Sequence, residues 1–191
     1  MKYKINEIFK SFQGEGTNLG KEVIFIRFSG CNLNCEWCDT EHSKYNEMNE
    51  HDILKEVEKL NCKSIILTGG EPTIYNLFPL LFLLKKYWIG IESNGANIKA
   101  FYGKIDYIAV SPKRKMFDLK VDEIRLVNDN LNIDDMLYYE KFDIKNKFIS
   151  VLEQNGYFNL KETFELLGKV NEKVKNKWRI NEQYHKRLKI K

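Results

Sequence analysis

Three of the four cysteines in this 191-residue chain lie within eight residues of each other, in a spacing suited to metal chemistry. Cys31, Cys35 and Cys38 follow a C-x3-C-x2-C pattern. Cysteine thiolates hold iron–sulfur clusters, and a cubane cluster normally takes four of them. Because no fourth cysteine lies nearby, the spacing predicts a cluster with one iron open to another ligand. An open metal position is typical of a catalytic site.

A structural zinc site is the alternative reading of these cysteines. Structural zinc usually takes four protein ligands, commonly in two closely spaced pairs. Only His42 or Cys62 could complete such a set, and neither lies at a zinc-finger spacing. We interpret Cys62 instead as a packed core thiol between a helix and a strand.

The elements around the cysteines alternate between strands and helices, which predicts a mostly parallel sheet with right-handed crossovers. The β-branched and aromatic composition identifies the strands. Six strands are expected, at Val23–Phe28, Ser64–Leu67, Ile89–Glu92, Asp106–Val110, Glu123–Val127 and Lys147–Leu152. Helices are expected at His51–Leu60, Leu77–Tyr87, Asp134–Phe142 and Leu160–Val174. We expect a single domain over residues 1–191.

Four successive strands end in polar or glycine-containing loops, and the cysteine loop is the first of them. The others are Thr68-Gly69-Gly70-Glu71-Pro72, Ser93-Asn94-Gly95 and Ser111-Pro112-Lys113. In parallel α/β folds, sites are built at the C-terminal edge of the strands. Alone, Thr68–Pro72 would suit an ordinary strand-to-helix turn, and Lys113 a solvated surface charge.

Composition limits the possible partners and locations. The net charge of +4 is too small to indicate nucleic-acid binding, and it suits an anionic substrate equally well. The first residues, MKYKINEIF, lack the apolar region of a secretory signal, and no apolar run reaches the ~20 residues that a membrane span needs. We therefore expect a cytoplasmic protein without membrane or nucleic-acid partners, whose cysteines serve metal or redox chemistry.

The cysteine spacing after the first core strand resembles the signature of the radical S-adenosylmethionine (SAM) superfamily. The resemblance implies a partial (β/α) barrel of about six mostly parallel strands, a 4Fe-4S cluster on the three cysteines, and SAM as cofactor. Gly69 and Gly70 would let the backbone approach SAM closely. The residues implied in SAM binding are Trp37 beside the adenine, Cys38, Asp39, Gly70, Glu92, Ser111, Pro112 and Lys113.

The N-terminal segment narrows the resemblance to the 7-carboxy-7-deazaguanine synthase family of queuosine (7-deazapurine) biosynthesis. Residues 7–17 read EIFKSFQGEGT, and the cysteine loop ends in Cys-Asp-Thr. A Gln183-x-His185-Lys186 match follows near the C-terminus, whereas residues 115–175 resemble the family weakly, where its helical shell is reduced. The implied enzyme is a carbon–nitrogen lyase.

The resemblance implies a specific reaction. A reduced cluster cleaves SAM to methionine and a 5′-deoxyadenosyl radical, which abstracts hydrogen from 6-carboxy-5,6,7,8-tetrahydropterin. The ring then contracts, ammonia leaves and SAM is regenerated. The cofactor supplies the chemistry, and the protein orients and shields the reactants.

The same resemblance assigns substrate contacts along the chain. Arg27 would pair with the substrate carboxylate, for which its planar fork is suited, although an arginine there could also lie on a solvated strand face. Glu15 would accept hydrogen bonds from the amino-pyrimidine. Thr40 would help to bind Mg2+, although Thr40 or Asp39 could instead cap a turn. The remaining substrate residues are Phe12, Gln13, Gly14, Thr68, His185 and the terminal Lys191.

A reduced flavodoxin as electron donor and a homodimer are also implied. Two other functions stay open at this point. A radical SAM activase, which installs a glycyl radical on a partner protein, would share the cluster and SAM loops but would not call for the QGEG segment or Arg27. A non-enzymatic zinc-binding module would use the cysteines but would leave Thr68–Pro72 unexplained.

Overall fold

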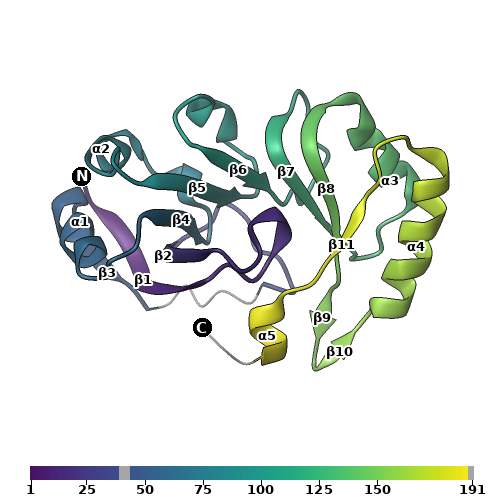
Figure 1. The fold of residues 1–191 in the computed structure, drawn as a ribbon, viewed down its shortest axis with the longest axis horizontal. Helices are drawn as coiled ribbons and strands as arrows, with labels where there is room; N and C mark the ends of the chain where they lie inside the picture. The colour runs from purple at the N-terminus through teal and green to yellow at the C-terminus, as the bar shows by residue number, and fades with distance from the viewer. Residues whose placement is uncertain (39–43, 189–191) are drawn as a thin grey trace. The chain divides into compact units, whose positions relative to one another are not determined.

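The computed structural model describes residues 1–38 and 44–188, and of His185 it describes the backbone alone (Figure 1). The chain divides into two compact units, each described here by itself. The first unit comprises Met1–Gln13 and Lys21–Ile108, and the second comprises Gly14–Gly20 and Ala109–Lys191. The short Gly14–Gly20 segment therefore leaves the first unit between two of its strands and belongs to the second.

The first unit is built on strands β1, β2, β3, β4 and β5, in the sheet order β3-β1-β2-β4-β5. Strands β2, β4 and β5 are parallel, and β1 is antiparallel to β2 and β3. The strands span Tyr3–Phe12 (β1), Glu22–Phe28 (β2), Asn46–Met48 (β3), Ser64–Gly69 (β4) and Trp88–Ser93 (β5). The helices are α1 (Glu50–Glu58) and α2 (Phe78–Leu83), with single 3-10 turns η2 (Pro72–Ile74) and η3 (Ile98–Phe101).

Both faces of this sheet are buried along most of β2, as expected of strands in a parallel sheet. Val23 and Phe25 join Ile66 in an apolar cluster on one face, with Phe9 and Trp88 packed against it. Alternation puts Arg27 on that same face, beyond the apolar cluster. At the C-terminal end of β2, the charged side chain of Arg27 thus lies next to an apolar cluster.

The second unit has the strand order β6-β7-β8-β11, in which neighbouring strands are parallel. Strand β6 spans Tyr107–Val110, and its last two residues, Ala109 and Val110, belong to this unit. The other strands of the sheet are β7 (Lys120–Val127), β8 (Asp143–Ser150) and β11 (Arg179–Asn181). Strands β9 (Glu153–Gln154) and β10 (Tyr157–Phe158) form a separate hairpin. Its helices are α3 (Ile133–Tyr138), α4 (Leu160–Lys173) and α5 (Tyr184–Leu188), with 3-10 turns η1 (Gly16–Asn18) and η4 (Tyr139–Lys141).

The expected α/β class with mostly parallel strands is confirmed, and all six expected strands form. Two expected helices are shorter than the apolar pattern indicated. Instead of Leu77–Tyr87, helix α2 ends at Leu83, because the chain must turn to begin β5, where Trp88 N donates to Lys63 O at 2.9 Å. The expected helix 134–142 divides into α3 and the tighter turn η4.

Capping explains where the first helix begins. The Asn49 side chain accepts from the backbone of His51 and Asp52, and the Asp52 carboxylate accepts from Asn49 N at 3.1 Å. This reciprocal arrangement satisfies N–H groups that a helix N-terminus otherwise leaves unpaired. Among the described residues, no helix is long and apolar enough to cross a bilayer.

Candidate functional site

The cysteine loop leaves the C-terminal end of β2 and is attached at its base to the segment that follows β4. Glu71 N donates to the Gly30 carbonyl at 2.9 Å. The Tyr75 hydroxyl donates to the Ser29 carbonyl at 2.6 Å. Burial raises the pKa of Tyr75, which keeps this phenol a protonated donor. The loop therefore starts from a fixed base in the first unit.

None of the three loop cysteines forms a disulfide. Cys31 and Cys35 are half-buried, and Cys38 is exposed. Leu33 N points at the Cys31 sulfur at 3.4 Å, and the Asn94 amide lies 3.9 Å from the same sulfur. Hydrogen bonds of this kind to cluster sulfur ligands tune a cluster's reduction potential.

The loop suits an iron–sulfur cluster by the chemistry of its donors. Its thiols are not in disulfides, and they lie on a loop outside the helices and strands. Among the described residues, no three histidine, cysteine or acidic side chains are already gathered as a ligand set. Metal ligands are commonly drawn together only as the metal binds.

Glu71 joins the loops that follow β4 and β5. Its side chain is 0% exposed, so its carboxylate must be satisfied by protein donors. It accepts from Thr73 N at 3.0 Å, from Ser93 Oγ at 2.8 Å and from Asn94 N at 2.6 Å. The Asn94 amide then donates to Asn32 Oδ1 at 2.8 Å. Through these hydrogen bonds, Glu71 and Asn94 connect the end of β5 to the cysteine loop.

A cluster of three predicted site residues lies at the C-terminal ends of β4 and β5. Thr68 Oγ1 donates to Glu92 Oε2 at 2.8 Å, and Gln13 Nε2 donates to Glu92 Oε1 at 3.0 Å. Gln13 is buried, while Thr68 and Glu92 are half-buried. The structure therefore brings together residues expected for substrate and for SAM, with both Glu92 oxygens engaged.

Arg27 on β2 lies beside Thr68 in the sheet. Its register partners are Glu7 on β1 and Thr68 on β4. Its Nη1 donates to Glu7 Oε1 at 2.6 Å, and its guanidinium lies over the Phe9 ring at 5.3 Å. Among the residues that the structure describes, no second acceptor contacts the guanidinium. An arginine has five N–H donors, so an edge remains for an incoming carboxylate.

Glu15 belongs to the second unit and is held by several side chains there. Gln183 Nε2 donates to Glu15 Oε1 at 2.8 Å, and Asn181 Nδ2 donates to Oε2 at 3.0 Å. Arg125 Nη1 lies 3.4 Å from Oε2. The carboxylate expected to meet an amino-pyrimidine is therefore surrounded by N–H donors of the protein.

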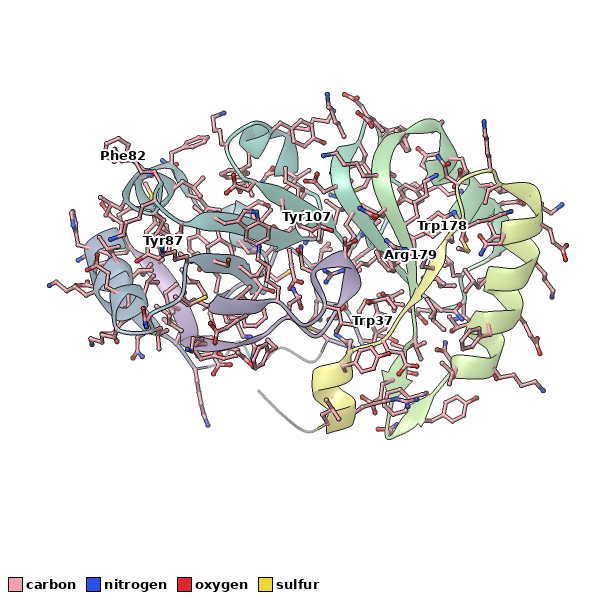
Figure 2. All side chains as sticks on the ribbon, in the orientation of Figure 1. Trp37, Phe82, Tyr87, Tyr107, Trp178 and Arg179 are labelled. Atoms are coloured by element: carbon pink, nitrogen blue, oxygen red, sulfur yellow. The ribbon has the colours of Figure 1, made fainter. Side chains whose placement is uncertain are left out.

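The other predicted residues with described side chains take varied positions. Phe12, the last residue of β1, is 56% exposed, and Lys113 Nζ donates to Ser111 Oγ at 2.7 Å. Gly14 and Pro112 are buried, and Trp37 is half-buried (Figure 2). Cys62, expected in the core, is only half-buried, and its thiol donates to the Glu22 carbonyl at the start of β2 at 3.5 Å.

Asp39, Thr40 and Lys191 lie outside the described residues, as does the side chain of His185. Among the described residues, Glu7, Glu71, Asn94, Glu123 and Arg125 take part in the networks around predicted positions although the sequence reading did not select them. One signal was available: an ionisable residue inside an apolar strand, as in the DEIRLV run of β7, requires a partner.

The loop and the parallel sheet are those of a radical SAM protein, and sequence comparison agrees. A family model described as Radical SAM superfamily matches residues 25–174. The 7-carboxy-7-deazaguanine synthase of Haemophilus influenzae is 40% identical over 98% of this chain and 94% of its own length. The enzyme of the same name from Bacteroides thetaiotaomicron is 36% identical over 100% of both chains. The chain belongs to the 7-carboxy-7-deazaguanine synthase family.

A solved structure supports the same assignment. The crystal structure of QueE from Escherichia coli superposes with a TM-score of 0.69 at 25% sequence identity, covering 96% of this chain and 94% of that one. The chain is thus a radical SAM enzyme, a family whose members use a 4Fe-4S cluster and SAM on a small-molecule substrate with a reductant. The activase and the zinc module are not favoured.

Proposed function

We propose that this enzyme converts 6-carboxy-5,6,7,8-tetrahydropterin to 7-carboxy-7-deazaguanine with loss of ammonia, for queuosine and 7-deazapurine synthesis. One observation carries the proposal. The C-x3-C-x2-C loop is hydrogen-bonded through Asn94 and Glu71 to the same strand ends that gather Gln13, Thr68 and Glu92. The cysteine loop and the polar residues Gln13, Thr68 and Glu92 thus lie at the same edge of one sheet.

In this proposal Cys31, Cys35 and Cys38 hold the cluster, and the chain acts as one radical SAM domain over residues 1–191. When bound, cluster and SAM supply the electron and the hydrogen-abstracting power of the reaction. The chain's residues bind, orient and shield. Gly70 approaches SAM with its backbone, and Glu92 offers acceptors to hydroxyl groups. Trp37, Cys38, Asp39, Ser111, Pro112 and Lys113 complete the proposed SAM contacts.

The proposed substrate contacts are distributed by charge. Arg27 meets the carboxylate with its open edge, because Glu7 occupies only Nη1. Glu15 accepts hydrogen bonds from the N–H groups of the amino-pyrimidine. The Thr68 hydroxyl forms a hydrogen bond with the substrate. Phe12, Gln13, Gly14, His185 and Lys191 are the other proposed contacts.

The remaining proposals concern partners and place. We infer a reduced flavodoxin as electron donor, a homodimer, and a cytoplasmic enzyme without nucleic-acid or membrane partners. A reduced flavodoxin is a carrier that could supply the single electron that the cluster needs. Size-exclusion chromatography with light scattering tests the dimer directly.

An anaerobic assay tests the proposed function. Reconstituted protein, SAM, reductant and carboxytetrahydropterin are expected to yield 7-carboxy-7-deazaguanine, identified by mass spectrometry. Consumption of SAM only in the presence of a protein partner would favour the activase. Stoichiometric zinc without iron or sulfide in anaerobically purified protein would favour the zinc module.

Magnesium dependence tests the role proposed for Thr40. Mg2+ prefers hard oxygen ligands, which a hydroxyl and a substrate carboxylate provide together. Product formation should therefore rise with added Mg2+ and fall on chelation, while SAM cleavage without pterin stays unchanged. Full product formation in metal-free buffer with chelator would contradict the site.

Replacing Arg27 by lysine should weaken substrate use by roughly 1–3 kcal/mol, the value of a hydrogen bond to a charged group. Lysine keeps the charge but loses the planar fork that could serve Glu7 and a substrate carboxylate together. Calorimetry with the pterin measures the loss. SAM cleavage without substrate should persist.

Lys10→Gln is the matched control for this substitution. Lys10 pairs with Glu22 at 3.3 Å across the same two strands, and its side chain is 39% exposed. Removing it should leave pterin affinity unchanged. Unchanged affinity in Arg27→Lys as well would remove Arg27 from the site.

A further inference from the structure

The Gly14–Gly20 segment is a closed loop whose backbone is bound by buried side chains of the second unit. Thr17 N donates to Glu123 Oε2 at 2.7 Å, and Gly16 N donates to Asn181 Oδ1 at 2.8 Å. Tyr184 N donates to Gly14 O at 3.2 Å. Strand β7, strand β11 and the start of α5 thus each contribute one hydrogen bond to the loop that carries Glu15.

Glu123 and Arg125 form a buried ion pair on β7. Glu123 is 0% exposed and Arg125 is 6% exposed. Arg125 Nε donates to Glu123 Oε1, while Arg125 Nη1 reaches Glu15 Oε2 at 3.4 Å. Burying charged groups costs free energy even when they are paired, so such a pair is weak evidence of a purely stabilising role. Its connection to the loop offers another reason for its presence.

The loop backbone lies directly against the Glu123 carboxylate. Gly16 has a positive φ of +64°, and a Cβ at this position would stand 2.7 Å from Glu123 Cδ. Contact this close is open only to glycine. The loop backbone at Gly16 therefore packs directly against the Glu123 side chain.

The register of the sheet explains why these groups converge. Arg125 pairs with Phe148 on β8, and Phe148 pairs with Arg179 on β11, so all three side chains face one side. Asn181, two residues after Arg179, shares that face and donates to both Ser150 Oγ and Glu15 Oε2 at 3.0 Å. Figure 2 labels Arg179 on this strand beside Trp178.

We propose that Glu123 and Arg125 are positioning residues for Glu15, and that through it they set recognition of the amino-pyrimidine edge of the substrate. Glu123 holds the loop backbone at Thr17, and the other side of the Arg125 fork holds one Glu15 oxygen. The carboxylate is then presented as an acceptor for ligand N–H groups without reorganising when the ligand arrives. This inference rests on the proposed function.

The shape of arginine is essential to this role. Its Nε serves Glu123 while Nη1 serves Glu15, so one rigid plane spans two carboxylates. A lysine ammonium keeps the charge but is a single point on a flexible stem, and it cannot hold that geometry. Arg125→Lys therefore separates positioning from charge.

The experiment compares two ligands, carboxytetrahydropterin and its 2-oxo analogue, which lacks the 2-amino group. Dissociation constants are measured anaerobically by calorimetry on reconstituted protein with SAM. A site built to pair with an N–H group rejects an analogue that lacks it. Wild-type protein should prefer the 2-amino compound, and Arg125→Lys should reduce that preference by about 10- to 100-fold, the equivalent of one charged hydrogen bond. Glu123→Gln should reduce it as well.

Lys147→Met is the matched control. Lys147 is an equally buried cation on neighbouring β8 and is paired with Glu140 at 2.7 Å, but its register partner is Ile124, so it faces away from Arg125. Its loss should lower the melting temperature and leave the ligand preference unchanged.

Each outcome supports or overturns the proposed positioning role of Glu123 and Arg125. A folded Arg125→Lys protein with the wild-type preference would overturn the proposal. If that variant does not fold, Glu123→Gln decides by the same ratio, and if neither folds the pair is structural and the proposal is wrong. A wild-type protein that binds neither pterin would instead refute the proposed function, and the inference with it.

Discussion

Cys35→Ala is expected to abolish product formation and uncoupled SAM cleavage together. Removing the middle thiolate of the C-x3-C-x2-C loop leaves two cysteines, which cannot hold three irons of a cubane. Iron and sulfide analysis after reconstitution, with the visible absorption spectrum, should show loss of most of the cluster. Rates should fall to background, because no cluster remains to transfer an electron to SAM.

Cys62→Ala is the matched control for this experiment. Cys62 is a free, half-buried thiol outside the loop, with its sulfur against the carbonyls of Glu22 and Ser64. Its loss should leave iron content and rate unchanged. Normal product from Cys35→Ala, or a fourth protein side chain bound to the cluster, would contradict the ligation proposed here.

Gly69→Ala should cause the largest loss of stability, about 3–5 kcal/mol, from the combined cost of a left-handed backbone and a steric collision. Gly69 has φ +113°, and an added Cβ would overlap the Phe28 carbonyl oxygen and stand 2.5 Å from Phe28 N. These are backbone atoms of β2, which cannot turn aside. The next residue, Gly70, also bonds to Phe28 O through its N–H at 2.9 Å.

Chemical denaturation monitored by circular dichroism measures this loss. Gly103→Ala separates its two causes, because Gly103 also has a positive φ, +72°, but an added Cβ would meet nothing within 4 Å. We expect that control to lose only about 1–2 kcal/mol, the cost of the left-handed conformation. Equal losses in the two variants would show that the collision with β2 contributes nothing.

Much of the fold could be predicted because apolar runs specify buried parallel strands independently of distant contacts. Strand β1 was missed for a physical reason. Its sequence YKINEIFKSF mixes charged and apolar residues, as an antiparallel strand beside the short β3 can, and it carries an irregularity between Ile5 and Glu7. The start of β8 was missed similarly, since residues 143–146 read as polar although Ile144 pairs with Val121.

The site shows where sequence reasoning ends. The cysteine loop and the Thr68–Pro72 loop could be found because their chemistry is local in the chain. The Glu7–Arg27 pair depends on the register of β1 against β2, and the contact of Glu123 with Thr17 joins residues 106 positions apart. Neither spacing nor composition contains such a register, so these partners emerge only in three dimensions.

The Gly14–Gly20 loop also has a consequence for the order in which the molecule assembles. Its hydrogen-bonding partners lie on β7 and β11, and Asn181 follows Gly16 by 165 positions in the chain. Contacts between such distant positions form slowly, since the intervening chain must first be closed into a loop. The Gly14–Gly20 loop is therefore expected to become ordered late in folding, after β7 and β11 have formed.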